Sequence, residues 1–273
     1  MNKKTLFFVL MAVFILVFAV LAIDYRLNIV YYTIENEHNE EQNRIVLITD
    51  LHSCSYGGED MSELLDAVRA QNPDAVLLGG DIFDSRRMPE TNSKTVLKAL
   101  GKEFDCYYIS GNHEVRHEKL EYYKDLVRSC GITVLEGECI SDFLPGIDLY
   151  GFDDITAYAD PIEQFTHLSE LVYEHRESEN FALLLTHNPA YFDTYSTMGY
   201  DLILCGHVHG GQWRIPGIIN GIYAPGQGIF PKYAGGYYKE NETEMIISRG
   251  LAKESSLIPR IFNRPELVVI DIT

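Results

Sequence analysis

The sequence predicts an α/β protein in which two packed β-sheets carry helices on their outer faces, behind an N-terminal membrane helix. In the first half of the chain, short apolar runs of strand length alternate with segments whose apolar residues recur at helical spacing. The second half is richer in strand-like runs, which indicates a second sheet. Residues 6–23 form an unbroken apolar run that a globular core does not need.

The apolar run at residues 6–23 follows Lys3 and Lys4 and precedes Asp24. Its length is enough to cross a bilayer core of roughly 30 Å as a helix. The lysines predict that the N-terminus stays inside, so the rest of the chain would lie on the extracytoplasmic side of the cell membrane. The alternative is a cleaved signal peptide and a secreted domain, because Val20-Leu21-Ala22 resembles a cleavage site. The run is longer than a usual signal sequence, which favours the uncleaved anchor.

Three regions follow from this pattern. We expect residues 1–23 to be the transmembrane anchor or signal, and residues 24–43, which are polar and acidic toward their end, to be a juxtamembrane stalk with an edge strand at 29–34. The folded domain is expected at residues 44–273. Its length of roughly 230 residues suits one domain with a sizeable core.

The elements of the domain follow in order along the chain. Strands are predicted at 44–49, 75–78, 106–109 and 132–135, with helices at 61–68, 95–100 and 120–129. This alternation predicts a largely parallel sheet with helices on its faces. Further strands are predicted at 147–151, 181–186, 200–205, 221–223, 244–248 and 267–272, with one helix at 162–175. The stretch between 209 and 238 is dense in Gly and Pro and is predicted to be an ordered loop around a site.

Charge and cysteine content exclude some function classes. The formal net charge is −18, so a nucleic acid or an anionic bilayer would on average be repelled, and no nucleic-acid partner is expected. The five cysteines show no CxxC spacing and do not form a disulfide framework. Cys106 and Cys205 lie in apolar runs and are predicted to be buried thiols. Cys54 lies two residues after His52 and could approach a metal, although a structural role is favoured.

Five short polar segments contain the residues that carry chemistry. Four of them follow the apolar runs 45–48, 75–78, 183–185 and 202–204, and one follows the mixed run 106–109. Ligands in α/β proteins bind at the carboxyl ends of strands, so these segments are expected to meet at one rim. The segments are Asp50-Leu51-His52, Gly79-Gly80-Asp81, Gly111-Asn112-His113-Glu114, His187 and Gly206-His207-Val208-His209.

These residue types suit a centre with two metal ions. A two-metal hydrolytic site needs a bridging carboxylate, mixed oxygen and nitrogen ligands, and an open position for water. Asp81 follows two glycines, which let the backbone approach closely, and its carboxylate can bridge two ions. His207 and His209 are two residues apart, so one extended segment can present both imidazoles on one side.

The order and spacing of the segments resemble the calcineurin-like metallophosphoesterases. The family pattern D-x-H, G-D-x-x-D, G-N-H-[DE], H, G-H-x-H is matched at every position, including Asp84 in the second motif and Glu114 in the third. The chain is most similar to the YkuE/YaeI-like bacterial branch of membrane-associated or exported phosphodiesterases. The features that suggest this branch are residues 206–212, Ser248-Arg249-Gly250-Leu251, Pro259-Arg260-Ile261-Phe262 and Pro265-Glu266.

The resemblance implies a four-layer αββα sandwich and a role for each motif residue. One divalent metal would be held by Asp50, His52, Asp81 and His209. The second would be held by Asp81, Asn112, His187 and His207. His113 would be the catalytic residue, as general acid or electrostatic stabiliser, and Asp84 and Glu114 would orient their neighbours. The donor set suits Mn, Fe or Zn.

The implied function is hydrolysis of a phosphoester, most readily a phosphodiester in a lipid-linked or cell-envelope substrate. The alternatives are a non-catalytic metal-binding interaction module and a metal-dependent nuclease, and the acidic charge disfavours the nuclease. Substrate choice must come from loops. Arg86 and Arg87 could bind a substrate phosphate or pair with surface carboxylates. An apolar wall near the rim could be lined by Trp213, Tyr223, Phe230, Tyr233 and the run 215–219.

Overall fold

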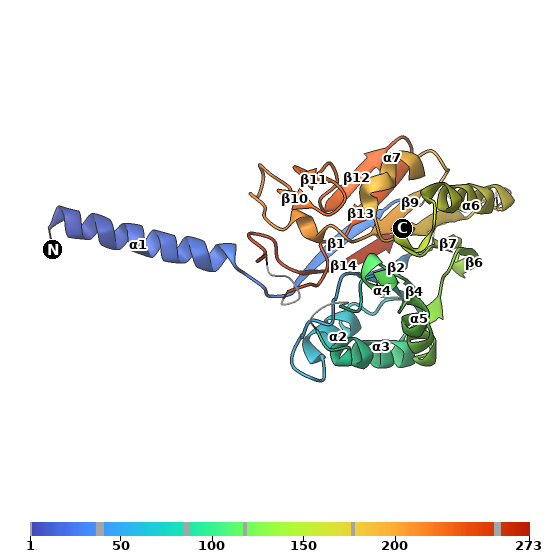
Figure 1. Cartoon of the computed structure of the whole chain (residues 1–273), viewed down its shortest axis with the longest axis horizontal. Coiled ribbons are helices and arrows are strands. Elements are labelled where there is room, and N and C mark those ends of the chain that lie inside the picture. Colours follow the sequence, from blue (N-terminus) through green and yellow to red (C-terminus); the bar gives the residue numbers. More distant parts are fainter. Residues whose placement is uncertain (1, 37–40, 85–87, 117–118, 176–177, 254–257) are drawn as a thin grey trace.

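Two six-stranded sheets pack face to face, and helices cover their outer faces (Figure 1). One long helix at the N-terminus projects away from the domain. The computed structural model describes residues 2–36, 41–84, 88–116, 119–175, 178–253 and 258–273. The predicted αββα sandwich is confirmed, and the projecting helix is the predicted apolar N-terminal segment.

The first sheet has the strand order β1-β14-β2-β3-β4-β5. Its pairs are parallel except for β14 against β2. The strands are β1 (Asn28–Ile34), β2 (Asn43–Ile48), β3 (Ala75–Gly79), β4 (Cys106–Ile109), β5 (Thr133–Val134) and β14 (Glu266–Ile272). Strand β1 covers the edge strand predicted at 29–34. Part of the expected stalk therefore belongs to the sheet, because main-chain pairing with β14 fixes it there.

The second sheet has the strand order β12-β13-β9-β8-β7-β6, with antiparallel pairs at its two ends and parallel pairs between them. Its strands are β6 (Glu138–Leu144), β7 (Ile147–Gly151), β8 (Phe181–Leu185), β9 (Leu202–Cys205), β12 (Gly236–Glu240) and β13 (Thr243–Ile247). The sequence did not predict β6 and β12. Both are edge strands whose residues are mostly polar or half-exposed, so they lack the apolar pattern of the central strands.

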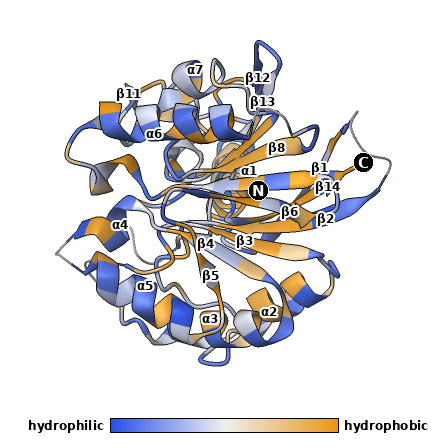
Figure 2. Cartoon of the chain, turned by 90° about the vertical axis from the view of Figure 1, so that its right-hand side faces the viewer, coloured by the Kyte–Doolittle hydropathy of each residue, from blue (hydrophilic) through white to orange (hydrophobic). Residues whose placement is uncertain are grey.

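The helices form the two outer layers, as Figure 2 shows. One layer consists of α2 (Ser62–Arg69), α3 (Thr91–Glu103) and α5 (Leu120–Ser129), and the other of α6 (Pro161–Glu174) and the short α7 (Phe192–Tyr195). Short turns lie at the strand ends: α4 (Asn112–Val115), η2 (Ile155–Ala157), η3 (Pro189–Tyr191) and η4 (His209–Gly211). Strands β10 (Tyr223–Ala224) and β11 (Gly228–Ile229) pair with each other outside the main sheets.

Three buried clusters correspond to the three interfaces between the four layers. In β2, Val46 and Ile48 pack against the layer of α2, α3 and α5, while Ile45 and Leu47 face the second sheet. Alternate residues of a strand point to opposite faces, so a strand buried on both sides reads as a continuous apolar run. The third cluster packs β8 and β9 against α6 and α7. Burial on both faces fixes the register of these strands and hence the positions of the loops after them.

Helix α1 (Lys3–Ala22) is long and apolar enough, by length and composition, to cross a membrane, and only 7% of it is buried. Its last residue contacts the domain: the backbone amide of Phe262 donates to the carbonyl of Ala22 at 2.7 Å. The ring of Phe18 also lies 5.2 Å from that of Phe262. The helix therefore joins the domain at a defined point, beside the loop that contains Phe262.

Candidate metal centre

The structure brings all eight side chains predicted for metals and catalysis to one place. Asp50 and His52 follow β2, Asp81 follows β3, and Asn112 begins α4 after β4. His113 follows Asn112 in α4, and the second sheet supplies His187, His207 and His209 after β8 and β9. The centre thus lies where the carboxyl ends of both sheets meet, which is where α/β folds place ligands.

One group that could hold a metal ion consists of Asp50, His52 and His209, whose ligand atoms all lie within 4.8 Å of one another. Nε2 of His209 lies 3.9 Å from Oδ1 of Asp50. The Asp50 carboxylate also accepts the backbone amide of His207, at 3.1 and 3.0 Å from its two oxygens. Asp50, which follows β2 of the first sheet, is thereby fixed to the loop after β9 of the second sheet.

A second group consists of Asp81, His187 and His207, again within 4.8 Å. Nε2 of His187 lies 3.3 Å from Oδ2 of Asp81, and Nε2 of His52 lies 3.5 Å from the same oxygen. Asp81 therefore faces ligand candidates of both groups. Nδ1 of His187 lies 2.8 Å from the carbonyl of Gly79, which can only accept, so Nδ1 carries the proton and Nε2 is left to bind a metal.

Asn112 completes the second group. Its Oδ1 lies 2.9 Å from Nδ1 of His207. The same atom position lies 3.3 Å from Oδ2 of Asp81, and turning the amide over would make its nitrogen the donor to both while its oxygen accepts from Arg116 at 2.8 Å. The orientation with oxygen toward Asp81 sets two acceptors face to face. The turned orientation pairs both ends of the amide within the protein, and a metal at this position would instead require the oxygen to face Asp81.

Unpartnered nitrogen atoms give a further test of whether these side chains fit a metal ion. Within the described residues, both ring nitrogens of His52 and Nδ1 of His209 are buried and have no hydrogen-bond partner. Buried polar atoms are normally paired, and an unpaired one costs about 1–3 kcal/mol. Nitrogen lone pairs beside Asp50 and Asp81 are the donors expected of a site for a divalent transition metal.

His113 lies beside both groups. One of its nitrogens lies within 4.8 Å of ligand atoms of His52 and Asp81, and its ring centroid is 4.3 Å from that of His52. Its side chain is 18% exposed, whereas those of His52 and His187 are 3% and 0% exposed. His113 is therefore placed between the buried ligands and solvent, where a substrate would arrive.

Burial and neighbouring charges shift the pKa values of the ligand candidates and so set their protonation states. Burial raises the pKa of Asp50 to about 6, and lowers those of His52 and His207 to about 3 and about 4. The two imidazoles are thus neutral near pH 7, as metal ligands must be. Burial alone would lower the pKa of His187, but the facing carboxylate of Asp81 outweighs it and raises this pKa well above its ordinary value. Protons and metal therefore compete for Nε2 of His187.

The backbone of the ligand loops is strained. Five of the predicted ligands have positive φ angles between 46° and 71°: Asp50, His52, Asp81, His207 and His209. Residues with a side chain rarely adopt this conformation, and the strain costs of order 1–3 kcal/mol at each position. Left-handed turns straight after the strands direct these side chains to a shared point rather than along the strands.

Glycines allow the loops to approach one another. A Cβ atom on Gly206 would lie 2.4 Å from Oδ2 of Asp50, and one on Gly111 would lie 2.3 Å from Oδ1 of Asp81. Neither glycine needs a positive φ, so both are required by close approach rather than by backbone conformation. The glycines of the Gly-Asn-His-Glu and Gly-His-x-His segments thus make room for carboxylates on neighbouring loops.

Glu114 and Asp84 support the centre. The buried carboxylate of Glu114 accepts the backbone amides of Asp81 at 2.9 Å, Gly111 at 2.8 Å and Phe83 at 3.0 Å. It therefore joins the loops after β3 and β4. Burial, together with the charge of Asp81, raises the pKa of Glu114 to about 7. Oδ1 of Asp84 lies 3.5 Å from Nδ1 of His113.

Two supporting residues were not assigned a role from the sequence. Nδ2 of Asn263 donates to the carbonyl of His209 at 2.7 Å, and a Cβ atom on Gly210 would lie 2.4 Å from the Asn263 side chain. The buried guanidinium of Arg260 donates to the carbonyls of Ala252 and Arg249, both at 2.8 Å. In the sequence, residues 259–262 were noted only as a family feature. No sequence pattern indicated that this segment contacts the loop of His209.

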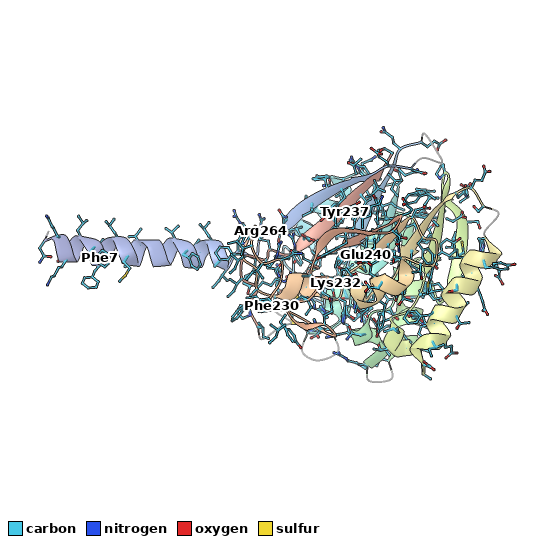
Figure 3. All side chains as sticks on the ribbon, turned by 90° about the horizontal axis from the view of Figure 1, so that it is seen from above. Phe7, Phe230, Lys232, Tyr237, Glu240 and Arg264 are labelled. Carbon is cyan, nitrogen blue, oxygen red and sulfur yellow. The ribbon has the colours of Figure 1, made fainter. Side chains whose placement is uncertain are left out.

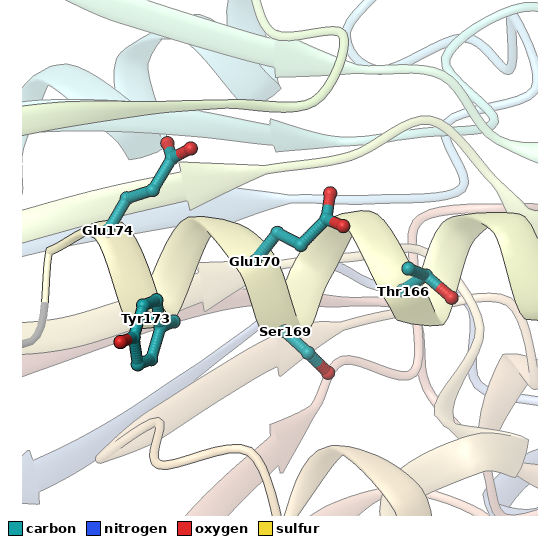
Figure 4. A pocket seen from close by; sticks show the side chains of 5 residues that line it. All are labelled: Thr166, Ser169, Glu170, Tyr173 and Glu174. Carbon is teal, nitrogen blue, oxygen red and sulfur yellow. The ribbon is translucent and has the colours of Figure 1, made fainter.

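Other predicted features fall away from the centre. Cys54, Cys106 and Cys205 are buried in the cores, and no cysteine belongs to a candidate metal group among the described residues. Arg86 and Arg87 lie outside the described residues. A pocket on one face of α6 (Figure 4) is lined by residues that belong to none of the metal groups: Thr166, Ser169, Glu170, Tyr173 and Glu174.

The protein is a four-layer sandwich, and Asp and His groups able to bind metal meet at the ends of its strands. This combination is typical of metallophosphoesterases. The family model described as calcineurin-like phosphoesterase matches residues 43–211, and the chain belongs to this family. The family is one of phosphoester hydrolases and typically uses a binuclear divalent metal centre.

The relatives agree with this assignment and with the predicted branch. Phosphodiesterase YaeI of Escherichia coli is 29% identical over 240 residues, covering 84% of this chain and 82% of YaeI. The uncharacterised metallophosphoesterase YkuE of Bacillus subtilis is 27% identical over 241 residues, covering 86% and 80%. Other relatives are longer: the chain spans 46% of a metallophosphoesterase from Helicobacter pylori that is 29% identical over 175 residues, which cover 63% of this chain.

One solved structure agrees with this fold. TT1561 of Thermus thermophilus superposes with a TM-score of 0.51 at 11% identity, covering 78% of this chain and 92% of that one.

Proposed function

We propose that this protein is a membrane-anchored phosphodiesterase that hydrolyses a lipid-linked or cell-envelope phosphodiester with two divalent metal ions. The observation that carries the proposal is the position of Asp81, whose Oδ2 faces His52 at 3.5 Å and His187 at 3.3 Å. A carboxylate between two sets of ligands is what a bridged pair of metals requires. In this proposal residues 1–23 are the anchor, 24–43 connect it to the hydrolase domain of 44–273, and β1 within the connecting segment pairs with β14 of that domain.

Each side chain then has one role. Asp50, His52 and His209 would hold one cation, and Asn112, His187 and His207 the other, with Asp81 shared. Two divalent cations, when bound, would supply positive charge for the phosphoryl oxygens and lower the pKa of an attacking water. The metals would be Mn, Fe or Zn, which accept these mixed oxygen and nitrogen donors.

His113 would act on the leaving group. Its position between the buried ligands and solvent suits a residue that touches the substrate. The carboxylate of Asp84 lies 3.5 Å from Nδ1 of His113 and can orient the ring. As the bond from phosphorus to the ester oxygen breaks, His113 would give its proton to that oxygen, so that the leaving group departs as a neutral alcohol.

Membrane anchoring supports the choice of substrate. Helix α1 is long and apolar enough to cross a bilayer, and Lys3 and Lys4 at its start favour an extracytoplasmic domain. A hydrolase joined to the bilayer by a few residues meets lipid-linked phosphoesters at high local concentration. The name of YaeI, phosphodiesterase, agrees with a diester substrate.

The test is metal analysis of the full-length protein together with a panel of three substrates: a phosphomonoester, a bis-ester and a lipid diphosphate. Activity on the bis-ester but not on the monoester supports the proposal. Two metals bound without activity on any of them would indicate a non-catalytic metal-binding module. Salt-sensitive cleavage of DNA in the same preparation would indicate a nuclease instead.

A further inference from the structure

A cluster of large apolar side chains lies exposed on one part of the domain. Ile218, Ile229 and Phe230 are 80%, 70% and 67% exposed, and Trp213, Ile215 and Tyr223 are between 41% and 48% exposed. We call these six residues the apolar face. Single exposed apolar residues are ordinary, whereas six within eighteen consecutive positions, 213–230, indicate a surface that something covers.

The apolar face belongs to an ordered segment. The amide of Phe230 donates to the carbonyl of Ile222 at 2.8 Å, and the amide of Ile222 donates to the carbonyls of Gly211 and Trp213 at 3.0 and 2.9 Å. Strands β10 and β11 close the segment. These contacts hold the side chains outward, so their exposure is a property of the fold.

The apolar face adjoins the end of α1. Trp213 forms a β-bridge with Ile261, and its indole Nε1 donates to the carbonyl of Pro259 at 2.9 Å. The next residue, Phe262, donates its amide to Ala22, the last residue of α1. Figure 1 shows β10 and β11 on the side of the domain from which α1 emerges, and Figure 3 shows Phe230 on that side.

Charge on this part of the chain differs from the rest. The protein has 40 acidic residues and a net charge of −18, yet the sequence has no Asp or Glu between Asp201 and Glu240. The cations in this interval are Arg214, Lys232 and Lys239. An acidic domain is on average repelled from lipid phosphates, and the segment of the apolar face adds no negative charge of its own. The nearest cation pairs in this interval are Lys232 with Asp193 and Glu240, and Lys239 with Glu244.

We propose that the apolar face docks on the lipid surface of the membrane that α1 spans, with Trp213 at the level of the headgroups. Tryptophan and tyrosine favour this level because their rings are apolar while their N–H or O–H groups remain hydrated or bonded. The proposal rests on the anchoring role of α1 given above. A second copy of the chain suits the surface less well, because the face continues directly from a membrane-crossing helix.

Docking would set the orientation of the metal centre. Trp213 lies four residues after His209, and the loop between them is held by Asn263, whose Nδ2 contacts the carbonyls of His209 and Gln212 at 2.7 and 3.1 Å. A bilayer in contact with Trp213 would thus border the rim of the site. The substrate class that this geometry favours is a phosphoester in a lipid headgroup, which could enter without leaving the membrane.

Trp213 provides the test, because it is the only tryptophan of the protein. The full-length chain is reconstituted in phosphatidylcholine vesicles, with acyl chains either unlabelled or brominated near the headgroup. Bromine quenches a nearby indole, so brominated lipid should reduce Trp213 emission about twofold if the ring lies at the interface. Aqueous iodide is the complementary quencher and should have little effect.

Two variants make the test specific. Changing Ile218→Asp and Phe230→Asp together places charges on the apolar face and should restore the emission in brominated vesicles, while vesicle flotation through α1 is retained. Ile162→Asp is the matched control: Ile162 is 68% exposed on α6, distant from α1 in Figure 1, and its change should leave the quenching intact.

Three results would overturn the proposal. Quenching by iodide but not by brominated lipid means that the face lies in water. Protection from both quenchers means that protein covers it, and dependence on the protein-to-lipid ratio would identify a second copy. Failure of the chain to float with the vesicles would show that α1 does not anchor it in the membrane. None of these readouts needs turnover, so lipid quenching without hydrolysis would overturn only the proposed function.

Discussion

Oδ2 of Asp81 and Nε2 of His187 lie 3.3 Å apart, although the two residues follow strands of different sheets. Asp81 follows β3 of the first sheet and His187 follows β8 of the second. The contact between Asp50 and the amide of His207 crosses the same junction. The site therefore exists only when the two sheets are packed in their native register, and the apolar cluster between them positions the ligands.

Asp81→Asn should remove metal and activity together. The substitution keeps the size of the side chain but takes the negative charge from a carboxylate that faces ligand candidates of both sets. We expect binding of both ions to weaken and diester hydrolysis to fall below detection, with the fold retained. Metal content and turnover of the same preparation measure this. Normal activity in the variant would show that Asp81 does not bridge the metals.

His113→Ala should reduce turnover without removing the metals. A general acid contributes about 10²–10⁴-fold to a rate, so a loss in this range is expected. Metal content should stay near that of the unchanged protein, because His113 is not one of the assigned ligands. A substrate with a more acidic leaving alcohol needs less protonation and should lose less rate. Loss of both metals in this variant would make His113 a ligand instead.

The sequence was sufficient for the parts of the fold that local pattern encodes. The uninterrupted apolar runs of β2, β3, β8 and β9 predicted buried strands, and the motif residues after them predicted the site. Strands β6 and β12 were missed because their exposed faces break that pattern. The contact between Asn263 and the carbonyl of His209 joins residues 54 positions apart, and no local pattern encodes it.

The positive φ angles at the ligands are likewise a result of the assembled site. Asp50, Asp81 and His209 have no intrinsic preference strong enough to predict a left-handed backbone, and only surrounding contacts over-determine it. Exposure of Ile218 and Phe230 also follows from tertiary structure, because apolar residues in a sequence are by default expected inside.

Glu114→Gln should destabilise the two loops that Glu114 joins. The carboxylate accepts three backbone amides, and a glutamine nitrogen in place of one oxygen would face donors instead of accepting from them. A buried unpaired group costs about 1–3 kcal/mol, so we expect that loss in the free energy of unfolding, measured by denaturation, and weaker metal binding. Glu59→Gln, at an exposed position, is the matched control and should change neither quantity. Equal stability of the two variants would show that Glu114 does not hold the loops.

Removal of metal should lower the melting temperature of the unchanged protein. Asp50 and Asp81 are buried and close to each other, and bound cations would offset their repulsion in the folded state while binding little to the unfolded chain. At a free metal concentration one hundred times the Kd, this linkage stabilises the fold by about 2.7 kcal/mol for each site. A chelator should therefore lower the Tm, and added Mn, Fe or Zn should restore it. Asp81→Asn provides the control, since a protein that no longer binds metal should melt at one temperature with or without chelator. If the unchanged protein also melts at one temperature while metal analysis shows both ions lost, the centre does not contribute to the stability of the junction between the sheets.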